Sequence, residues 1–379
     1  MHVHPPLTVG AVLSLHGSFA LQGQLAHAGL ALWAADVNAA GGLAVPARGP
    51  CPIALWVYDD ASRSAVAATR AEQLIVADQV DLLLGPYGSG LTHVVAAVAA
   101  RYGKVLWNHG GAADILLQPS FPPVVTLLSP AHQYFVAILE MIRQRAPAVR
   151  RVALVGEAQG SFAPSVLAGA AAWVQQAGWE LVLQAPYPRA PAPFEPLVQQ
   201  LHMAKPDIVL GVGRSQADLA FAQACRTQHL QAPVLGLVAT PLQRFQETLG
   251  RAAEGCVGPS QWEAGVRYAP DVGPTAAAFA AAFRARYQMA AEYPAAQAYA
   301  AGLIAAECIR RAGSLADAAL WTAARQLAVT TFYGGFQLDP GSGAQIGHAV
   351  LVVQWQGAQK RIVWPPEQAE AELALPAGW

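Results

Sequence analysis

At 379 residues the chain is too long for one ordinary hydrophobic core, so its length favours two lobes. Apolar residues make up 54% and charged residues only 12%, which excludes a disordered chain and indicates large buried sheets covered by helices. The 23 basic side chains balance 24 acidic ones, so the composition predicts no nucleic-acid partner. No apolar run is long enough to predict a transmembrane span.

The pattern from Leu7 onward alternates strand, loop and helix, which is typical of a parallel sheet covered on both faces. Strands are predicted at 7–13, 53–58, 80–84, 104–107, 152–155, 179–184, 208–211 and 234–238. Helices are predicted at 22–38, 64–78, 92–101, 132–145, 164–176, up to 204, 276–289 and 295–311. The proline-rich stretch 186–196 is expected to be a surface loop, the stretch 256–262 resembles a strand, and the tail segments 334–338 and 348–355 look antiparallel.

Two neighbouring strands end in glycine-rich loops. The first loop is Gly85-Pro86-Tyr87-Gly88-Ser89-Gly90, before a helix, and the second, at 108–114, contains Gly110 and Gly111. A helix N-terminus offers unpaired backbone N–H groups to a carboxylate or phosphate. Two such loops side by side predict one edge of a binding pocket, although ordinary strand–helix turns would look the same.

The sequence does not settle whether the cysteines form a disulfide or whether the protein is exported. The four cysteines, Cys51, Cys225, Cys256 and Cys308, are scattered without metal-ligand spacing, and buried free thiols are expected. The first residues show neither a charged segment nor an apolar segment of a signal peptide. Either an export signal has been removed or the protein stays inside the cell.

The motifs of catalysis are missing from the sequence. There is no G-x-S-x-G elbow, no Walker loop and no His pair at zincin spacing, and Gln216 stands where a dinucleotide fingerprint needs its third glycine. We therefore expect no enzyme, no catalytic residue, no metal and no cofactor.

The chain resembles the branched-chain amino-acid binding proteins of ABC importers, which have the type I periplasmic binding-protein fold. The resemblance is carried by five motifs in the expected order: 9–12, 17–23, 36–42, Tyr58-Asp59-Asp60 and 85–89. It covers essentially the whole chain and weakens after about Pro259.

This resemblance implies an α/β fold of two doubly wound lobes with mainly parallel sheets, three crossovers as a hinge, and a ligand cleft between the lobes. The implied lobes are 1–128 with 257–333, and 129–256 with 334–379. Hinge closure then captures the ligand.

The resemblance also implies a set of ligand-binding positions. Ser89 matches the residue that holds a ligand carboxylate, while Gly110, Gly111 and Ala112 match the second loop, with Ala112 in place of a hydroxyl residue. Phe162 stands near a stacking aromatic residue, and Arg214 and Gln22 occupy the places of two others. Tyr87, Phe162, Trp262 and Tyr293 could supply flat apolar walls, as could Trp107 unless it lies in the core.

Val238 is the departure from the family pattern that bears on the ligand, because amino-acid binders have an acid there for the ligand ammonium. An unpaired buried ammonium costs about 3–5 kcal/mol. Either Glu157 or Glu263 substitutes, or the ligand has no ammonium. Arg214 suits a carboxylate or carbonyl, so a small or aromatic carboxylate or amide is favoured over an amino acid.

The predicted function is an extracytoplasmic solute-binding protein that delivers its ligand to an ABC permease in the membrane. The alternative is a cytoplasmic ligand-sensing regulator, of the amide-sensor type, on the same fold.

Overall fold

The computed structural model describes residues 5–45, 48–117, 123–187 and 193–375, so part of the predicted loop 186–196 lies outside it. The chain divides into unit 1, residues 1–129 and 266–349, and unit 2, residues 130–265 and 350–379. It passes between these units three times, after Ser129, Gly265 and Ala349.

Unit 1 is built on a parallel sheet of five strands in the order β4-β1-β5-β6-β7. Its first part contains β1 (Leu7–Leu13), α1 (Ala20–Ala39), β2 (Leu43–Val45), β3 (Gly49–Cys51), β4 (Ile53–Asp59), α2 (Ser64–Glu72), the π-helix η1 (Gln73–Ala77), β5 (Leu82–Leu84), α3 (Ser89–Arg101), β6 (Leu106–Asn108), η2 (Asp114–Leu117) and β7 (Val124–Thr126). Its second part contains α9 (Ala276–Tyr287), α10 (Tyr293–Ala312), α11 (Asp317–Gln326), β13 (Ala328–Thr331) and β14 (Gly334–Gln337).

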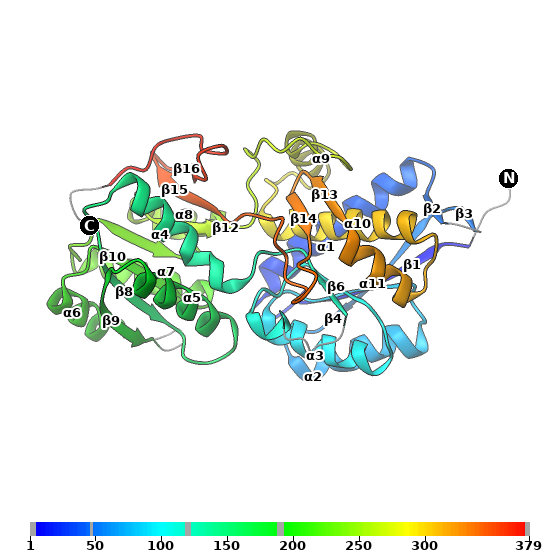
Figure 1. Ribbon diagram of the computed structural model, residues 1–379, viewed down its shortest axis with the longest axis horizontal. Coiled ribbons are helices and arrows are strands. Elements are labelled where there is room, and N and C mark those ends of the chain that lie inside the picture. Colours follow the sequence, from blue (N-terminus) through cyan, green and yellow to red (C-terminus); the bar gives the residue numbers. More distant parts are fainter. Residues whose placement is uncertain (1–4, 46–47, 118–122, 188–192, 376–379) are drawn as a thin grey trace. The chain divides into compact units, whose positions relative to one another are not determined.

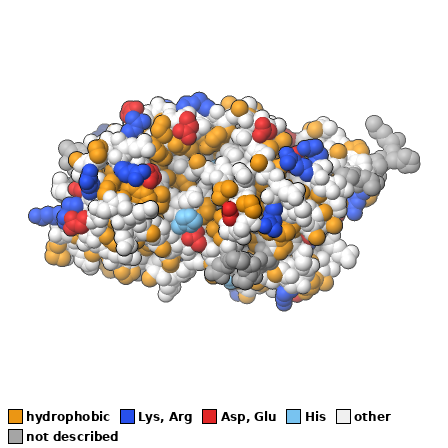
Figure 2. All heavy atoms as spheres, viewed as in Figure 1, with side chains coloured by type: hydrophobic (Ala, Val, Ile, Leu, Met, Phe, Trp, Pro, Cys, Tyr) orange, Lys and Arg blue, Asp and Glu red, His pale blue; other side chains and the backbone are white. Residues whose placement is uncertain are grey.

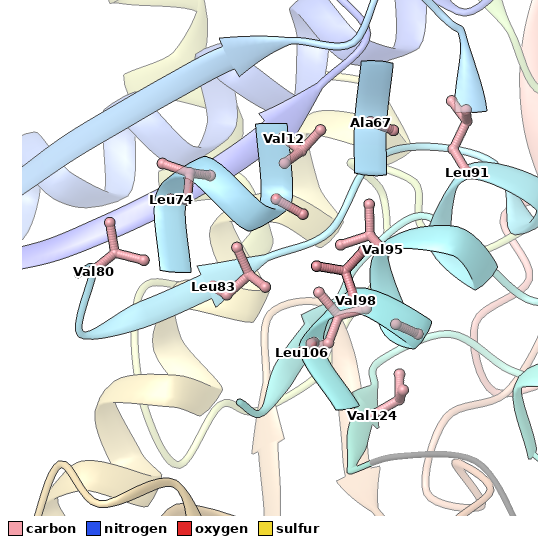
Figure 3. Packing of buried hydrophobic residues seen from close by; sticks show 13 residues of the cluster. Val12, Ala67, Leu74, Val80, Leu83, Leu91, Val95, Val98, Leu106 and Val124 are labelled. Atoms are coloured by element: carbon pink, nitrogen blue, oxygen red, sulfur yellow. The ribbon is translucent and has the colours of Figure 1, made fainter. Parts of the chain in front are cut away.

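The helices of unit 1 cover both faces of this sheet, with α2 and α3 on one face and α1 and α10 on the other (Figure 1). The α2–α3 face forms an apolar cluster in which Val12, Leu83 and Leu106 from the strands meet Leu91 and Val95 of α3 (Figure 3). This packing fixes the first turns of α3, which begins at Ser89, so the last two residues of the predicted glycine-rich loop belong to the helix.

Unit 2 is built on a sheet of seven strands in the order β16-β15-β12-β11-β10-β8-β9. The run from β12 to β9 is parallel, and β15 and β16 are added antiparallel. The elements are η3 (Ala131–Gln133), α4 (Tyr134–Arg145), β8 (Arg151–Gly156), α5 (Phe162–Gln176), β9 (Glu180–Pro186), α6 (Glu195–Ala204), β10 (Ile208–Val212), α7 (Ser215–Thr227), β11 (Val234–Leu237), α8 (Gln243–Leu249), η4 (Gly250–Ala253), β12 (Val257–Ser260), β15 (Leu351–Gln356) and β16 (Gln359–Trp364).

Two of the three predicted crossover positions need correction. Strand β12 pairs with β11 and β15, so residues 257–265 belong to unit 2 rather than to the first lobe. Strand β14 pairs antiparallel with β13, so residues 334–349 belong to unit 1. The tail segments predicted to be antiparallel are so, but each within its own unit. All four cysteines are buried and unpaired, as expected.

Candidate functional site

The loop between β5 and α3 presents a helix N-terminus at the carboxyl edge of the unit 1 sheet. Gly88 adopts a φ of 96°, a conformation that glycine takes without strain, and α3 begins at the next residue. Ser89, the first residue of α3, is only 5% exposed. The first N–H groups of a helix have no partner within the helix, so this end favours an anionic group.

The Ser89 hydroxyl oxygen is bound by the second glycine-rich loop. Its Oγ accepts hydrogen bonds from the backbone N–H groups of Ala112, at 3.1 Å, and Ala113, at 3.0 Å. A serine oxygen has two acceptor positions and one proton. Because both acceptor positions are occupied, the hydroxyl proton is available for an acceptor such as a ligand oxygen.

The second glycine-rich loop is folded around the side chain of Asn108, which is fully buried. Asn108 Oδ1 accepts from the amides of Gly110 and Gly111, at 3.1 and 2.8 Å, and Nδ2 donates to the Gly111 carbonyl at 2.7 Å. A Cβ atom at Gly110 would lie 2.5 Å from the Pro86 carbonyl oxygen, so this glycine allows the two loops to touch. The amides of Gly110, Gly111 and Ala112 thus have protein acceptors, and the loop acts through Ser89.

Aromatic side chains surround the first loop. The Tyr87 ring centroid lies 5.8 Å from that of Phe19 and 6.5 Å from that of Tyr293, the first residue of α10. The Tyr87 and Tyr293 hydroxyls are 2.6 Å apart. Burial raises the pKa of Tyr87 to about 12, so the phenol remains a neutral hydrogen-bonding group. Gln22, in the first turn of α1, is 5% exposed.

The structure therefore brings together, at one edge of unit 1, the predicted residues Tyr87, Ser89, Ala112 and Tyr293. Phe19 was missed by sequence reasoning, although it lies inside a motif that carried the resemblance. Trp107, whose role was left open, is fully buried in unit 1 and belongs to its interior.

In unit 2, four predicted residues follow the carboxyl ends of parallel strands. Phe162 begins α5 and packs edge-on against Tyr134, at a centroid distance of 5.2 Å. Arg214 follows β10, and Val238, which is half-buried, follows β11. Trp262 follows β12 and is 1% exposed, so its ring does not form an open wall.

The two acids considered as replacements at Val238 differ in their surroundings. Glu263 is engaged within unit 2, because its carboxylate lies 2.8 Å from Lys360 Nζ and accepts from Ser260 Oγ at 2.9 Å. Glu157 follows β8, is 7% exposed, and accepts from the backbone N–H of Arg214 at 3.1 Å. This hydrogen bond joins Glu157, after β8, to Arg214, after the neighbouring strand β10.

A third acid, Asp218, was missed by sequence reasoning. It lies in the first turn of α7 and is fully buried. Asp218 occupies the apolar face of α7, at helical spacing with Phe221, Ala222 and Cys225, which are also buried. That spacing was the available signal, because an acid in an apolar stripe requires partners inside the protein.

Two side chains of the site region have strongly shifted pKa values. Burial raises the pKa of Asp218 to about 8, with a further contribution from the nearby Glu157 and an opposing one from its hydrogen-bond donors. Burial lowers the pKa of His109, in the second glycine-rich loop, to about 4. Both groups are therefore uncharged at neutral pH.

The described residues show neither a patch of one charge on the face in Figure 2 nor a cluster of metal ligands. On the face drawn in Figure 2 the acidic and basic side chains are interspersed, in keeping with their balanced numbers. Among the described residues, no three His, Cys, Asp or Glu side chains are placed to hold a metal ion. None of the described helices is long and apolar enough to cross a membrane.

Comparisons with known proteins agree with this architecture. A family model described as "Periplasmic binding protein" matches residues 6–360. In fold, the chain is similar to the substrate-binding protein LivJ of a branched-chain amino acid transporter from Streptococcus pneumoniae, solved with isoleucine; the TM-score is 0.80 at 18% identity, covering 98% of this chain and 100% of that one. It is also similar to an ABC-transporter solute-binding protein from R. palustris solved with benzoate, with a TM-score of 0.77 at 19% identity, covering 98% and 99%.

Among curated proteins, the chain is 25% identical over 224 residues to Leu/Ile/Val-binding protein homolog 7 of Brucella abortus. That match covers 57% of this chain and 54% of the relative, so the chain spans about half the length of the curated relatives it matches. The chain belongs to the periplasmic binding protein family, and the predicted family and type I fold are confirmed. The family is one of solute-binding proteins, and it implies an extracytoplasmic location.

Proposed function

We propose that this protein is the solute-binding component of an ABC importer and that its ligand is a small carboxylate without an α-ammonium group, with aromatic carboxylates favoured. It would act outside the cytoplasm, pass its ligand to a membrane permease, and capture it by hinge closure, the mode that the family resemblance implies.

The observation that carries the proposal is the position of Val238. The segment after β11 presents a half-buried apolar side chain where amino-acid binders place an acid. Glu263 is already paired with Lys360, and Asp218 is enclosed within unit 2. A buried ammonium without a partner would cost about 3–5 kcal/mol, which is two to three and a half decades of affinity.

The anionic end of the ligand is assigned to unit 1. The Ser89 hydroxyl, whose oxygen accepts two backbone hydrogen bonds and whose proton is left for another acceptor, suits a carboxylate, as does the N-terminus of α3. The rings of Phe19, Tyr87 and Tyr293 suit a flat apolar body beside it. Benzoate, which one structural relative binds, and isoleucine, which another binds, are therefore natural probes.

Titration calorimetry with paired ligands tests the proposal. Leucine and 4-methylpentanoate share a skeleton and differ in the ammonium; benzoate and benzamide differ in the negative charge. We expect the acids without an amine to bind, leucine to bind at least 100-fold more weakly than its partner, and benzamide more weakly than benzoate. Equal binding of leucine and 4-methylpentanoate would assign the ammonium to Glu157 and overturn the ligand class.

A variant pair tests the site itself. Ser89→Ala removes this hydroxyl donor and should weaken carboxylate binding about 10- to 100-fold, since a hydrogen bond to a charged group contributes about 1.5–3 kcal/mol. Ser14→Ala is the control, because Ser14 is equally buried but donates within the protein to Asp60 at 2.7 Å. Equal losses in both variants would remove Ser89 from the site.

A further inference from the structure

The carboxyl of Asp218 joins two loops of unit 2. Its Oδ1 accepts from the Tyr187 hydroxyl at 2.5 Å, and its Oδ2 accepts from the backbone N–H of Ala239 at 2.9 Å. Tyr187 follows β9 and Ala239 follows β11, whereas Asp218 belongs to α7, after β10. One carboxyl thus holds the segments after three different strands.

Tyr187 extends this connection to a fourth strand. Its backbone N–H donates to the Gly156 carbonyl at 2.9 Å, at the end of β8. Its ring lies so close to Gly213 that a Cβ there would come within 2.7 Å of a ring carbon. The ring also stacks on Phe221, at a centroid distance of 5.6 Å, so the side chain is fixed on every side.

The residues held in this way adjoin the residues assigned to the ligand. Gly213 directly precedes Arg214, and Ala239 directly follows Val238. The Arg214 backbone N–H in turn donates to Glu157, the residue after Gly156. The Tyr187–Asp218 couple therefore contacts Gly156, Gly213 and Ala239, which are the chain neighbours of Glu157, Arg214 and Val238.

We propose that Tyr187 and Asp218 are the positioning residues of the unit 2 recognition surface, fixing Glu157, Arg214 and Val238 and so setting the preference of the site for an anionic ligand. This inference rests on the proposed function for its ligand, but its structural part does not. Neither side chain touches the ligand in this scheme; both act through the backbone segments that they join.

The same couple gives the surface a dependence on pH. The titratable groups that face the Tyr187–Asp218 couple are Glu157, at the end of β8, and Cys225, on α7. Within the couple, the Tyr187 hydroxyl is hydrogen-bonded to the Asp218 carboxyl. Asp218, whose pKa is about 8, is neutral at pH 7 and becomes charged at pH 9. A negative charge on Asp218 opposes an anionic ligand, and we expect a loss of roughly tenfold in affinity.

The chain offers a matched control in unit 1. There the Tyr299 hydroxyl donates to Asp36 at 2.8 Å, and Tyr299 is 4% exposed. This bond joins α10 to α1 and contacts neither glycine-rich loop. Tyr299→Phe therefore removes the same kind of hydrogen bond as Tyr187→Phe without touching a recognition surface.

Two measurements on Tyr187→Phe, Asp218→Asn and Tyr299→Phe test the inference. Amide hydrogen exchange of the ligand-free proteins should be faster over 211–218 and 236–241 in the first two variants only. Benzoate affinity, measured at pH 7 and pH 9, should fall about tenfold with pH in the wild type and Tyr299→Phe, and stay flat in Asp218→Asn.

The outcomes separate the two proposals. Unchanged exchange over both segments in Tyr187→Phe and Asp218→Asn would overturn the positioning role, whatever the ligand is. If the benzoate affinity of Asp218→Asn still falls with pH, Asp218 does not contribute to the preference for an anionic ligand. If the wild type binds no carboxylate of the panel, the proposed ligand class fails, while hydrogen exchange still decides whether the couple fixes the surface.

Discussion

Replacing Asp218 by asparagine should change how the stability of the protein depends on pH. The carboxyl is fully buried, and burial raises its pKa from 3.8 to about 8. Between these two values the unfolded chain releases a proton that the folded protein keeps. Folding then becomes less favourable as the pH rises, by about 1.4 kcal/mol for each pH unit.

The full effect follows from the two pKa values. A pKa difference of about four units corresponds to a loss of about 6 kcal/mol in the free energy of unfolding. This loss has not begun below pH 4 and is complete above pH 8. Asparagine carries no such proton, so this contribution disappears from its profile. Asparagine also places an N–H₂ group opposite one or more of the donors to Asp218, which are Tyr187, Ala239 and Gly213, and this costs about 1–3 kcal/mol at every pH.

The slope of the unfolding free energy against pH therefore distinguishes the effect of the retained proton, which depends on pH, from the loss of hydrogen bonds, which does not. Urea unfolding of the wild type and Asp218→Asn at half-unit steps from pH 4.5 to 8.5 gives the difference in unfolding free energy directly. We expect the variant to have a lower unfolding free energy than the wild type at pH 4.5. The difference should then shift steadily in favour of the variant as the pH rises to 8. Parallel profiles would refute the reasoning, because they would mean that the hydrogen bonds from Tyr187 and Ala239 keep Asp218 ionised at neutral pH.

Three further predictions concern the scaffold. Since the His109 pKa is lowered from 6.5 to about 4, the unfolded chain binds a proton first on acidification, and stability should fall by about 3 kcal/mol from pH 6.5 to 4; His109→Gln should flatten this part of the urea-unfolding profile. Glu263→Gln removes the counter-charge of the largely buried Lys360 ammonium, which keeps its hydrogen bond to the Pro241 carbonyl oxygen, and should cost about 3 kcal/mol, partly recovered by adding Lys360→Met; an unchanged melting temperature would contradict this. Gly29→Val should destabilise by about 3 kcal/mol in thermal unfolding, because a Cβ there would lie 2.0 Å from the Ala295 carbonyl oxygen.

Most of the parallel framework could be predicted from the sequence because its strands are short and apolar throughout. The strand Leu7–Leu13 was predicted to the residue, since a central parallel strand is buried on both faces and six of its seven residues are buried. The crossovers were harder to predict. Strand β12 begins at Val257, among glycine and proline, and its partners β11 and β15 lie far apart in sequence, so no local pattern shows which sheet it joins.

The candidate site was predictable where glycine marks it and not where long-range partners define it. Gly88 and Gly110 stand out because the turn and the close approach of the loops require them. The sequence does not reveal that Asn108 takes up the amides of the second loop, nor that Ser89 accepts two more. These bonds link residues across the fold, and they decide which donors remain for a ligand.

The apolar Val238 and the buried Asp218 together determine how much negative charge unit 2 presents near the end of β11. An acid at the end of β11 would face a ligand, remain charged and favour a cation. In this chain that position is apolar, and the buried acid Asp218 accepts hydrogen bonds from Tyr187 and from Ala239, the residue after Val238, and keeps its proton at neutral pH. Moving the carboxyl from the surface to the interior removes a negative charge from the recognition surface while keeping its backbone segments in place. The preference for an anionic ligand that we propose thus depends on where the acid lies as much as on the presence of Arg214.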